Sequence, residues 1–180
     1  MPAIRAAEAA DLPVFFDYLN AHLAGTGSAG APLFQPMARG SVFPDAKRAG
    51  FAQGLATALD QPGWRRLWLA EGDTGILGHI DLRARPEGAA RHRCLLGMGV
   101  HERARRCGLG MALLDVAIAW AGESARLEWV DLEVLGANGP ARGLYRKRGF
   151  VQTGEMPDLF RIDGERLAYI YMSLALSAER

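Results

Sequence analysis

Apolar residues recur along the chain at spacings that separate predicted helices from predicted strands. After Asp11, a typical N-cap residue, they follow the 3.6-residue period of a helix with one buried face. Further helices are predicted over 44–60 and 108–122, and a short one opens at Asn138-Gly139-Pro140 and ends at Gly149. The apolar faces expected for the first and third helices consist of Val14, Phe15, Tyr18, Leu19 and Leu23, and of Leu109, Leu113, Val116 and Trp120.

Seven segments are predicted to be strands, separated by residues that favour turns. Glu71-Gly72-Asp73-Thr74 joins the second and third strands in a hairpin, and Asp163-Gly164 separates the last two. The strands are expected at 3–6, 64–70, 75–83, 93–100, 127–134, 150–153 and 167–174. Their order with the helices predicts one mixed α/β domain over residues 1–180, without an internal repeat or a linker.

A long segment without a periodic pattern lies between the first two helices. Residues 24–43 are rich in glycine and proline, and loops of this length are uncommon in compact domains and often functional. Phe34, Met37 and Phe43 make this loop apolar. Two interpretations stay open, because these side chains either pack onto the core or face a substrate.

Composition narrows the class of protein. The chain has 180 residues, 49% of them hydrophobic, and a formal net charge of +1, which argues against disorder and against a long polyanionic partner such as nucleic acid. Cys94 and Cys107 do not form a disulfide framework, and no His cluster has metal-ligand spacing. No signal peptide is visible, and the longest apolar stretch, 111–122, is too short to cross a membrane. We therefore expect a cytoplasmic protein with no metal, membrane or nucleic-acid partner.

A turn rich in arginine and glycine gives the first indication of chemistry. It lies between the strand that ends at Val100 and the third helix, whose first N–H groups have no partner within the helix and favour anions. Gly108 and Gly110 would let a ligand approach the backbone, although the same glycines would also suit tight packing. The turn is a candidate phosphate cradle. Positive charge beside it comes from Arg103, Arg105 and Arg106.

Two common phosphate-binding motifs do not match this turn. A Walker loop requires Gly-Lys-Ser/Thr, but Met111 follows Gly110. A dinucleotide-binding fingerprint requires a third small residue and lies after the first strand, but position 113 is Leu and several strands precede the turn. Neither a P-loop NTPase nor a dinucleotide-binding fold is therefore indicated.

A second motif downstream gives the turn its context. Arg105-x-x-Gly108-x-Gly110 is followed by Asn138-x-x-Ala141-x-x-x-Tyr145 and then by Gly149-Phe150. In this order the two signatures resemble those of the GCN5-related N-acetyltransferase superfamily. The resemblance covers about residues 75–174. It implies an α/β (α+β) fold with a mixed, mostly antiparallel sheet of about seven strands, helices on both faces and a splayed central strand pair.

The resemblance implies acetyl-CoA as cosubstrate and assigns the residues that would hold it. Backbone N–H groups of the turn would bind the pyrophosphate, the strand ending at Val100 would pair with the pantetheine arm, and Asn138 would contact the pantetheine region. Gly97 and Gly99 would suit a β-bulge where this strand parts from the next. The implied cofactor-binding residues are Met98, Val100, Arg105, Arg106, Cys107, Gly108, Leu109, Gly110, Met111, Asn138 and Tyr145.

The resemblance also implies direct attack of an amine on the thioester. Tyr145 would lie near the sulfur and protonate the departing thiolate, and a backbone N–H near Met98 to Val100 would stabilise the oxyanion. Many relatives carry a carboxylate base five residues before the position of Val100, where this chain has Leu95. Deprotonation of the amine would then pass through water, and the substitute bases are Asp81, Glu133 and His92.

The predicted function is acetyl transfer from acetyl-CoA to the primary amine of a small molecule. The run from His92 to Val100 and the tail from Gly154 to Met172 are similar to bacterial acetyltransferases of amino acids or related amines, which are often homodimers. Acceptor recognition would involve the first helix, the 24–43 loop and residues 150–167. Two alternatives stay open. One is a protein N-terminal or lysine acetyltransferase, which would need an open groove. The other is a non-catalytic acyl-CoA-binding module; the missing carboxylate at Leu95 is its only support, and the presence of Tyr145 argues against it.

Overall fold

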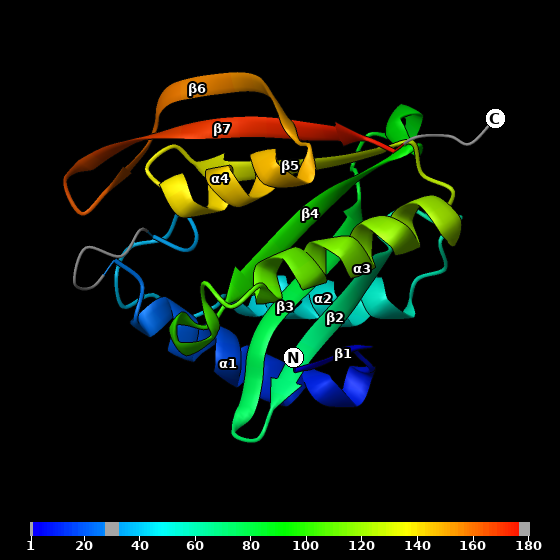
Figure 1. The fold of residues 1–180 in the computed structure, drawn as a ribbon, viewed down its shortest axis with the longest axis horizontal. Coiled ribbons are helices and arrows are strands. Elements are labelled where there is room, and N and C mark those ends of the chain that lie inside the picture. The colour runs from blue at the N-terminus through cyan, green and yellow to red at the C-terminus, as the bar shows by residue number, and fades with distance from the viewer. Residues whose placement is uncertain (1, 28–32, 177–180) are drawn as a thin grey trace.

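The computed structural model describes residues 2–27 and 33–176 (Figure 1). A seven-stranded sheet organises these residues. Its strands are β1 (Ala3–Ala6), β2 (Arg65–Gly72), β3 (Gly75–Ala84), β4 (Arg93–Val100), β5 (Trp129–Leu135), β6 (Val151–Ile162) and β7 (Glu165–Ala175). The α-helices are α1 (Leu12–Ala24), α2 (Asp45–Ala56), α3 (Leu109–Glu123) and α4 (Gly139–Arg148).

The sheet has the strand order β1-β2-β3-β4-β5-β7-β6, and all neighbours are antiparallel except β4 and β5. A parallel pair needs a crossover connection, and α3 supplies it. Figure 1 shows α3 and α4 in front of the sheet and α1 and α2 behind it. This arrangement confirms the expected mixed, mostly antiparallel sheet with helices on both faces.

Each face of the sheet buries its own apolar cluster. On one face, α3 packs against Ile80 of β3, and on the other face Phe15 of α1 packs with Leu69 of β2. All three side chains are fully buried. Because alternate residues of a strand point to opposite faces, His79 and Asp81 lie on the α1 face of β3. Polar side chains therefore enter the layer between the sheet and α1.

The parallel pairing of β4 with β5 is short. It runs from Arg93 opposite Trp129 to Leu96 opposite Leu132, after which the two strands diverge (Figure 1). We name these four pairs the seam. The opening between residues 97–100 of β4 and 133–135 of β5 is named the gap. The gap confirms the splayed strand pair that the resemblance implied.

The first helix differs from its prediction in two details. Val14 is 60% exposed, because the buried face is centred on Phe15 and Leu19. Asp11 does precede α1, but its side chain makes no capping hydrogen bond to that helix. Its carboxylate instead accepts a hydrogen bond from the Glu8 N–H at 2.7 Å and pairs with Arg5.

Two predicted boundaries are wrong. α2 ends at Ala56 instead of residue 60, because the backbone of Thr57 is already extended. β6 continues to Ile162, far beyond the predicted end at Thr153. Its register against β7 shifts twice, and Pro157 lies inside the second shift. Proline is tolerated there because an edge strand at a bulge needs no N–H donor.

Two further observations concern residues 2–27 and 33–176 alone. No helix in these ranges is long and apolar enough to cross a lipid bilayer. No group of three or more His, Cys, Asp or Glu side chains in them is placed to hold a metal ion. Cys94 is buried, Cys107 is exposed, and both are free thiols.

Candidate active site

The gap leaves one edge of β4 without a neighbouring strand. The His101 N–H donates to the Leu77 carbonyl of β3 at 2.8 Å, and successive residues of a strand direct their N–H and C=O groups to opposite edges. Met98 and Val100 therefore direct theirs into the gap. The Val100 carbonyl accepts a hydrogen bond from Arg105 Nε at 3.1 Å. This edge suits an extended ligand, which is the role predicted for Met98 and Val100.

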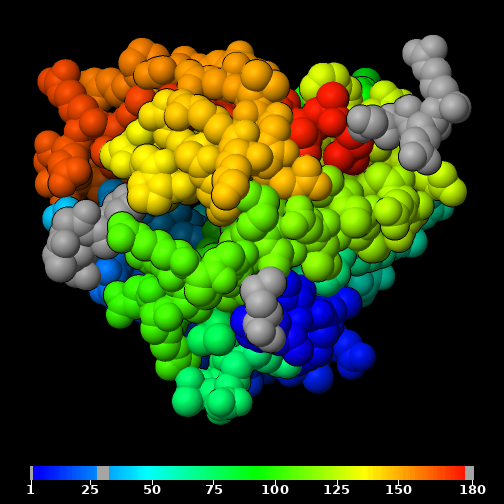
Figure 2. Space-filling view, viewed as in Figure 1, coloured from blue at the N-terminus to red at the C-terminus, as the bar shows by residue number. Residues whose placement is uncertain are grey.

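The turn between β4 and α3 presents a row of backbone N–H groups. Among the described residues, the N–H groups of 107–110 have no hydrogen-bond partner, because the first turn of a helix has no preceding carbonyls to bond. Gly108 adopts φ +86° at the N-cap of α3, and a Cβ there would meet nothing within 4 Å. Figure 2 shows the surface hollowed between this turn, in green, and α4, in yellow. The turn therefore fits a phosphate group.

The arginine side chains of the turn differ in their availability. Arg105 bonds the Val100 carbonyl, and Arg103 Nη2 donates to the Thr74 carbonyl at 3.4 Å. Arg106 is exposed and has no hydrogen bond or ion pair to any residue that the structure describes. Arg106 is thus the guanidinium most available to an anionic ligand.

The remaining positions of the turn contribute backbone, not side chains. A Cβ at Gly110 would lie 2.9 Å from Leu144 Cδ2, so glycine here allows α3 and α4 to approach each other. Of the two roles considered for this glycine, the structure supports tight packing, and the Gly110 N–H still belongs to the row of N–H groups without a partner among the described residues. Leu109 is buried in the core, Met111 is half-buried, and the Cys107 thiol donates to a backbone carbonyl at 2.9 Å.

The second motif lies on α4, as predicted. Asn138 caps the helix, its Oδ1 accepting from the Ala141 N–H at 3.2 Å, and Gly149 ends it at φ +102°. Tyr145 lies between them, is 6% exposed, and packs edge-on to Phe150 with ring centroids 5.8 Å apart. Burial raises the pKa of the Tyr145 hydroxyl, so it stays protonated at neutral pH. A general acid needs that state.

Tyr169 of β7 also affects the pKa of Tyr145, and Glu133 of β5 affects the pKa of Tyr169. Tyr169 of β7 adds to the rise in the pKa of Tyr145. The pKa of Tyr169 is itself raised to about 12, first by burial and then by the Glu133 carboxylate. Glu133 is exposed on β5, immediately beyond the seam. Tyr169 thus interacts electrostatically with both the predicted acid, Tyr145, and one predicted base, Glu133.

The other candidate bases are placed differently. Asp81 is 4% exposed, and its Oδ2 lies 3.3 Å from Arg65 Nη1 and 3.5 Å from Arg83 Nη1. His92 is exposed in the turn before β4, at the opposite end of that strand from the phosphate turn. Leu95 lies within the seam. The structure therefore engages Asp81 in ion pairs and places His92 far from the gap.

The bulge predicted at Gly97 and Gly99 is wrong. β4 pairs with β3 in unbroken register along its whole length. A Cβ at Gly97 would lie 2.7 Å from Asp81 Oδ1, and one at Gly99 would lie 2.7 Å from the Phe34 ring and 2.8 Å from the His79 ring. These positions require glycine for space, not for an unusual backbone angle.

The loop predicted over 24–43 packs onto the protein through its aromatic residues, and residues 28–32 lie outside the described residues. Phe43 is buried under α1 and α2, and Phe34 packs against Gly99. Arg39 bonds to the turn between β6 and β7. The apolar loop residues therefore join the core, and Phe34 does so directly beside the gap.

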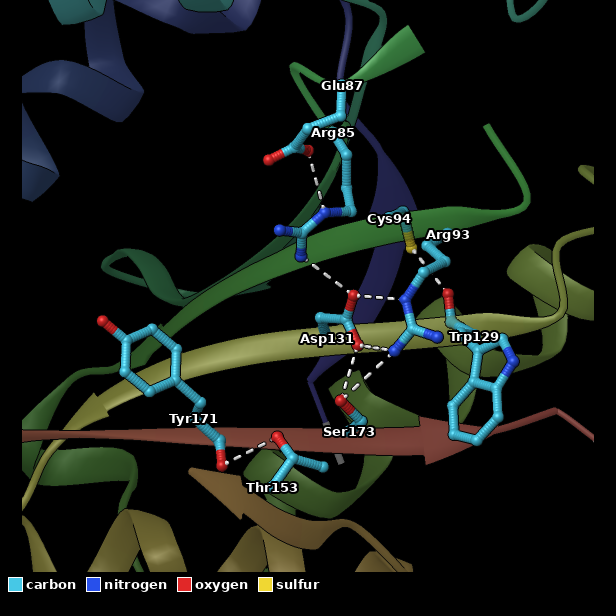
Figure 3. Close-up of polar contacts among 9 residues, drawn as sticks. All are labelled: Arg85, Glu87, Arg93, Cys94, Trp129, Asp131, Thr153, Tyr171 and Ser173. Carbon is cyan, nitrogen blue, oxygen red and sulfur yellow. Dashed lines mark hydrogen bonds and ion pairs between the residues drawn. The ribbon is translucent and has the colours of Figure 1, made fainter. Parts of the chain in front are cut away.

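A charged cluster beside the seam was not predicted from the sequence (Figure 3). Asp131 of β5 accepts hydrogen bonds from Arg93 Nε at 2.9 Å, Arg85 Nη1 at 3.0 Å and Ser173 Oγ at 2.7 Å. Burial alone would raise the pKa of Asp131, but the hydrogen bonds from Arg93 and Ser173 and the guanidinium charges outweigh it and lower the pKa. Asp131 is therefore ionised at neutral pH and ties β4, β5 and β7 together.

A cavity of about 430 Å³ lies beside this cluster. In Figure 3 the Arg85 guanidinium and the Tyr171 ring point toward the same space. Leu95 and Glu133 also line the cavity, so it extends from the seam to the gap. The only sequence signal was Asp131 alternating with apolar residues of β5, a pattern equally typical of a solvent-facing side chain.

Comparison with known proteins decides the family. Residues 32–150 match the model of the acetyltransferase (GNAT) family. The chain belongs to the GNAT acetyltransferase family. The acetyltransferase uses acetyl-CoA as its acetyl donor. The N–H groups of 107–110 suit the pyrophosphate of that donor, and the free edge at Met98 and Val100 suits its extended arm.

Solved acetyltransferases share this fold over nearly the whole chain. A GNAT-family acetyltransferase from Streptococcus pneumoniae has a TM-score of 0.79 at 24% identity and covers 98% of this chain and 100% of its own. A ribosomal-protein-alanine N-acetyltransferase from Brucella melitensis has a TM-score of 0.77 at 22% identity, and the match covers 97% of this chain and 99% of that one. A phosphinothricin acetyltransferase from Sinorhizobium meliloti, in complex with acetyl-CoA, has a TM-score of 0.77 at 20% identity, and the match covers 98% of this chain and 89% of that one. At these identities the likeness shows the fold.

Proposed function

We propose that this acetyltransferase acetylates the primary amine of a small molecule, an amino acid or a related amine. The observation that carries the proposal is the cavity beside the seam, whose volume of about 430 Å³ suits a small ligand. Its lining carries both signs of charge, with Arg85 near the seam and Glu133 near the gap. A molecule with both an amine and a carboxylate matches such a lining, because each of its groups meets an opposite charge.

The loop after α1 also favours a small acceptor. The Arg39 N–H donates to Asp163 Oδ2 at 3.1 Å, and Arg39 Nη2 lies 3.2 Å from Glu165 Oε1, both at the β6–β7 turn. Leu33 packs with Leu135 of β5, at the edge of the gap. The loop therefore crosses between the two halves of the sheet and narrows the approach for a folded protein surface.

The proposed reaction is direct attack of the amine nitrogen on the thioester carbonyl carbon of acetyl-CoA. Backbone N–H groups of Met98 and Val100 stabilise the oxyanion that forms. Water relays the proton lost by the amine to Glu133, which is exposed and lines the cavity. When the carbon–sulfur bond breaks, Tyr145 gives its proton to the thiolate. Asp81 keeps its ion pairs and has a structural role.

A thiol-release assay with acetyl-CoA tests the proposal on a panel of amino acids, polyamines, aminoglycosides and peptides. We expect turnover with amino acids or closely related amines. Glu133→Gln should lower kcat about 10²-fold without changing the affinity for acetyl-CoA, because it removes the proton acceptor. Glu128→Gln is the matched control, since Glu128 is an exposed carboxylate just before β5 and outside the cavity.

Two outcomes would contradict the proposal. Turnover confined to peptides would assign a protein acetyltransferase, and acetyl-CoA binding without turnover on any amine would assign an acyl-CoA-binding module. Equal kcat for Glu133→Gln and Glu128→Gln would remove Glu133 from the proton path while leaving the acceptor class standing.

A further inference from the structure

Three groups on the α1 face of the sheet form a buried polar contact that the reaction outlined above does not use. The Tyr18 hydroxyl of α1 donates to the Gly99 carbonyl of β4 at 3.3 Å, and Nδ1 of His79 on β3 lies 3.4 Å from the same hydroxyl. Tyr18 is 8% exposed and His79 is 3% exposed. The rings of Phe15 and Phe34 pack edge-on against His79. Polar groups enclosed by aromatic rings need their mutual hydrogen bonds, because water cannot replace them.

One arrangement of protons makes both contacts hydrogen bonds at the same time. Tyr18 has a single hydroxyl proton and donates it to the Gly99 carbonyl, so its oxygen meets His79 as an acceptor. Nδ1 of His79 then carries a proton. Burial lowers the pKa of His79 to about 3, so the imidazole is neutral at physiological pH and Nε2 carries no proton. In this arrangement His79 Nδ1 donates to the Tyr18 hydroxyl oxygen, and the Tyr18 hydroxyl donates to the Gly99 carbonyl.

Gly99 stands between the two residues that face the gap. Its N–H and C=O groups face β3, opposite His79, whereas those of Met98 and Val100 face the gap. A carbonyl has two lone pairs, so the Gly99 oxygen can accept from the β3 ladder and from Tyr18 together. We propose that Tyr18 and His79 are positioning residues for acetyl transfer, which hold β4 so that the N–H groups of Met98 and Val100 meet the oxyanion.

The proposal rests on the proposed function of those two N–H groups. Beyond the seam β4 has no strand on the β5 side, so β3 alone holds it within the sheet. The Tyr18 hydroxyl adds a contact from the helix layer at this point. An oxyanion donor acts on a charge that exists only in the transition state, and it acts only at hydrogen-bond distance. A small displacement of β4 therefore lowers kcat more than it changes substrate binding.

Kinetics of two variants and their combination test the positioning role. Tyr18→Phe keeps the ring, so we expect kcat to fall about three- to tenfold, the range for loss of one hydrogen bond, with KM for acetyl-CoA and the melting temperature nearly unchanged. His79→Phe should lower kcat in the wild-type background but little in the Tyr18→Phe background, because His79 acts through Tyr18. Phe16→Leu is the packing control. Phe16 lies on the same helix against Phe43 and Phe51, so this change should lower the melting temperature without changing kcat.

Nitrogen NMR of the imidazole tests the chain of hydrogen bonds independently of activity, because it distinguishes a protonated ring nitrogen from a bare one. We expect Nδ1 of His79 to be protonated and Nε2 to be bare at neutral pH. Tyr18→Phe should shift the Nδ1 signal, since it removes the acceptor. A bare Nδ1 with a protonated Nε2 in the wild type would overturn the direction of the chain and the proposal with it.

The kinetic outcomes separate this proposal from the proposed function. If the wild type acetylates an amine and Tyr18→Phe leaves kcat unchanged, the positioning role is wrong and the proposed function stands. Losses of kcat that simply add in the double variant would show that His79 does not act through Tyr18. If the wild type acetylates no amine, the proposed function fails and the positioning role fails with it.

Discussion

Replacing Asp131 with asparagine probes how the seam is held together. The carboxylate accepts from Arg93, Arg85 and Ser173, so it connects β4, β5 and β7 with the end of β3 (Figure 3). Asparagine keeps the volume but offers one carbonyl oxygen, and its NH₂ group would face guanidinium groups that are also donors. The variant therefore loses the ion pairs and leaves donors unpaired without opening a cavity.

The burial of the partners sets the size of the effect. Removing one member of a fully buried ion pair costs about 3–5 kcal/mol. The side chains of Arg93 and Arg85 are 25% and 28% exposed, so water compensates part of the loss. We expect Asp131→Asn to lower the free energy of unfolding by about 2–3 kcal/mol. For a chain of this size the melting temperature then falls by about 5–10 °C.

The effect should depend on pH in a defined direction. The pKa of Asp131 is lowered in the folded protein, whereas an aspartate in an unfolded chain has a pKa of about 3.9. The carboxylate therefore stabilises the wild type fully above the unfolded-state pKa, and the stabilisation is lost as the pH falls through the folded-state pKa. Urea unfolding at neutral pH and at about pH 3 should show the difference between wild type and variant shrinking at the acidic pH.

Glu87→Gln provides the control for this measurement. Glu87 pairs with the same Arg85, but its side chain is 57% exposed. Water screens an exposed ion pair, so this variant should stay close to the wild type. The reasoning about Asp131 would be refuted if its substitution cost no more than Glu87→Gln at neutral pH, or if the cost grew on acidification.

Three further substitutions test other parts of the site. Tyr145→Phe should lower kcat about 10²-fold with little change in CoA affinity measured by calorimetry, and an unchanged rate would contradict its role as acid. Gly108→Leu should weaken CoA binding about tenfold, because a side chain at φ +86° is strained and projects into the open cradle; intact binding would remove the cradle assignment. Gly99→Ala should lower the free energy of unfolding by about 1–3 kcal/mol, because its methyl group meets Phe34 and His79. Gly88→Ala, in open space, should cost little, and equal melting temperatures for the two alanine variants would contradict the crowding at Gly99.

The elements around the phosphate turn could be predicted because their signals are local. Gly108 takes a positive φ where α3 begins, and Asn138 and Gly149 cap the two ends of α4. Each of these residues decides the backbone within a turn of itself, so the sequence nearby is sufficient. The gap is different, because it follows from how two strands meet. It was expected only through resemblance to a family, not from the periodicity of this chain.

β6 could not be predicted from its own residues. Gly154, Pro157 and Asp158 favour a turn, and Asp158 adopts φ +50°. The strand forms because β7 offers a long edge to pair with, and two register irregularities accommodate the residues that do not fit. Pairing between strands overrides the local preference here, as is common for β-structure.

The groups that complete the site come from distant parts of the chain. Tyr18 and His79 are 61 residues apart, and Arg93 and Asp131 are 38 residues apart. A sequence pattern shows which residues share a face of one element, but the register between elements decides which side chains meet. Asp81 illustrates the limit. Its position between Ile80 and Leu82 shows that it faces away from them, but its ion pair with Arg65 depends on how β2 and β3 pair.

The seam also has a consequence for the order of folding. β2, β3 and β4 follow one another both in the chain and in the sheet, and β5, β6 and β7 lie together in one C-terminal segment, so each half assembles from nearby residues. Joining the halves requires α3 to dock and closes a long loop for only four residue pairs, so we expect this step late in refolding. A ligand lying in the gap touches both halves. Such a ligand would hold the two halves of the sheet together and thereby slow the unfolding of the enzyme.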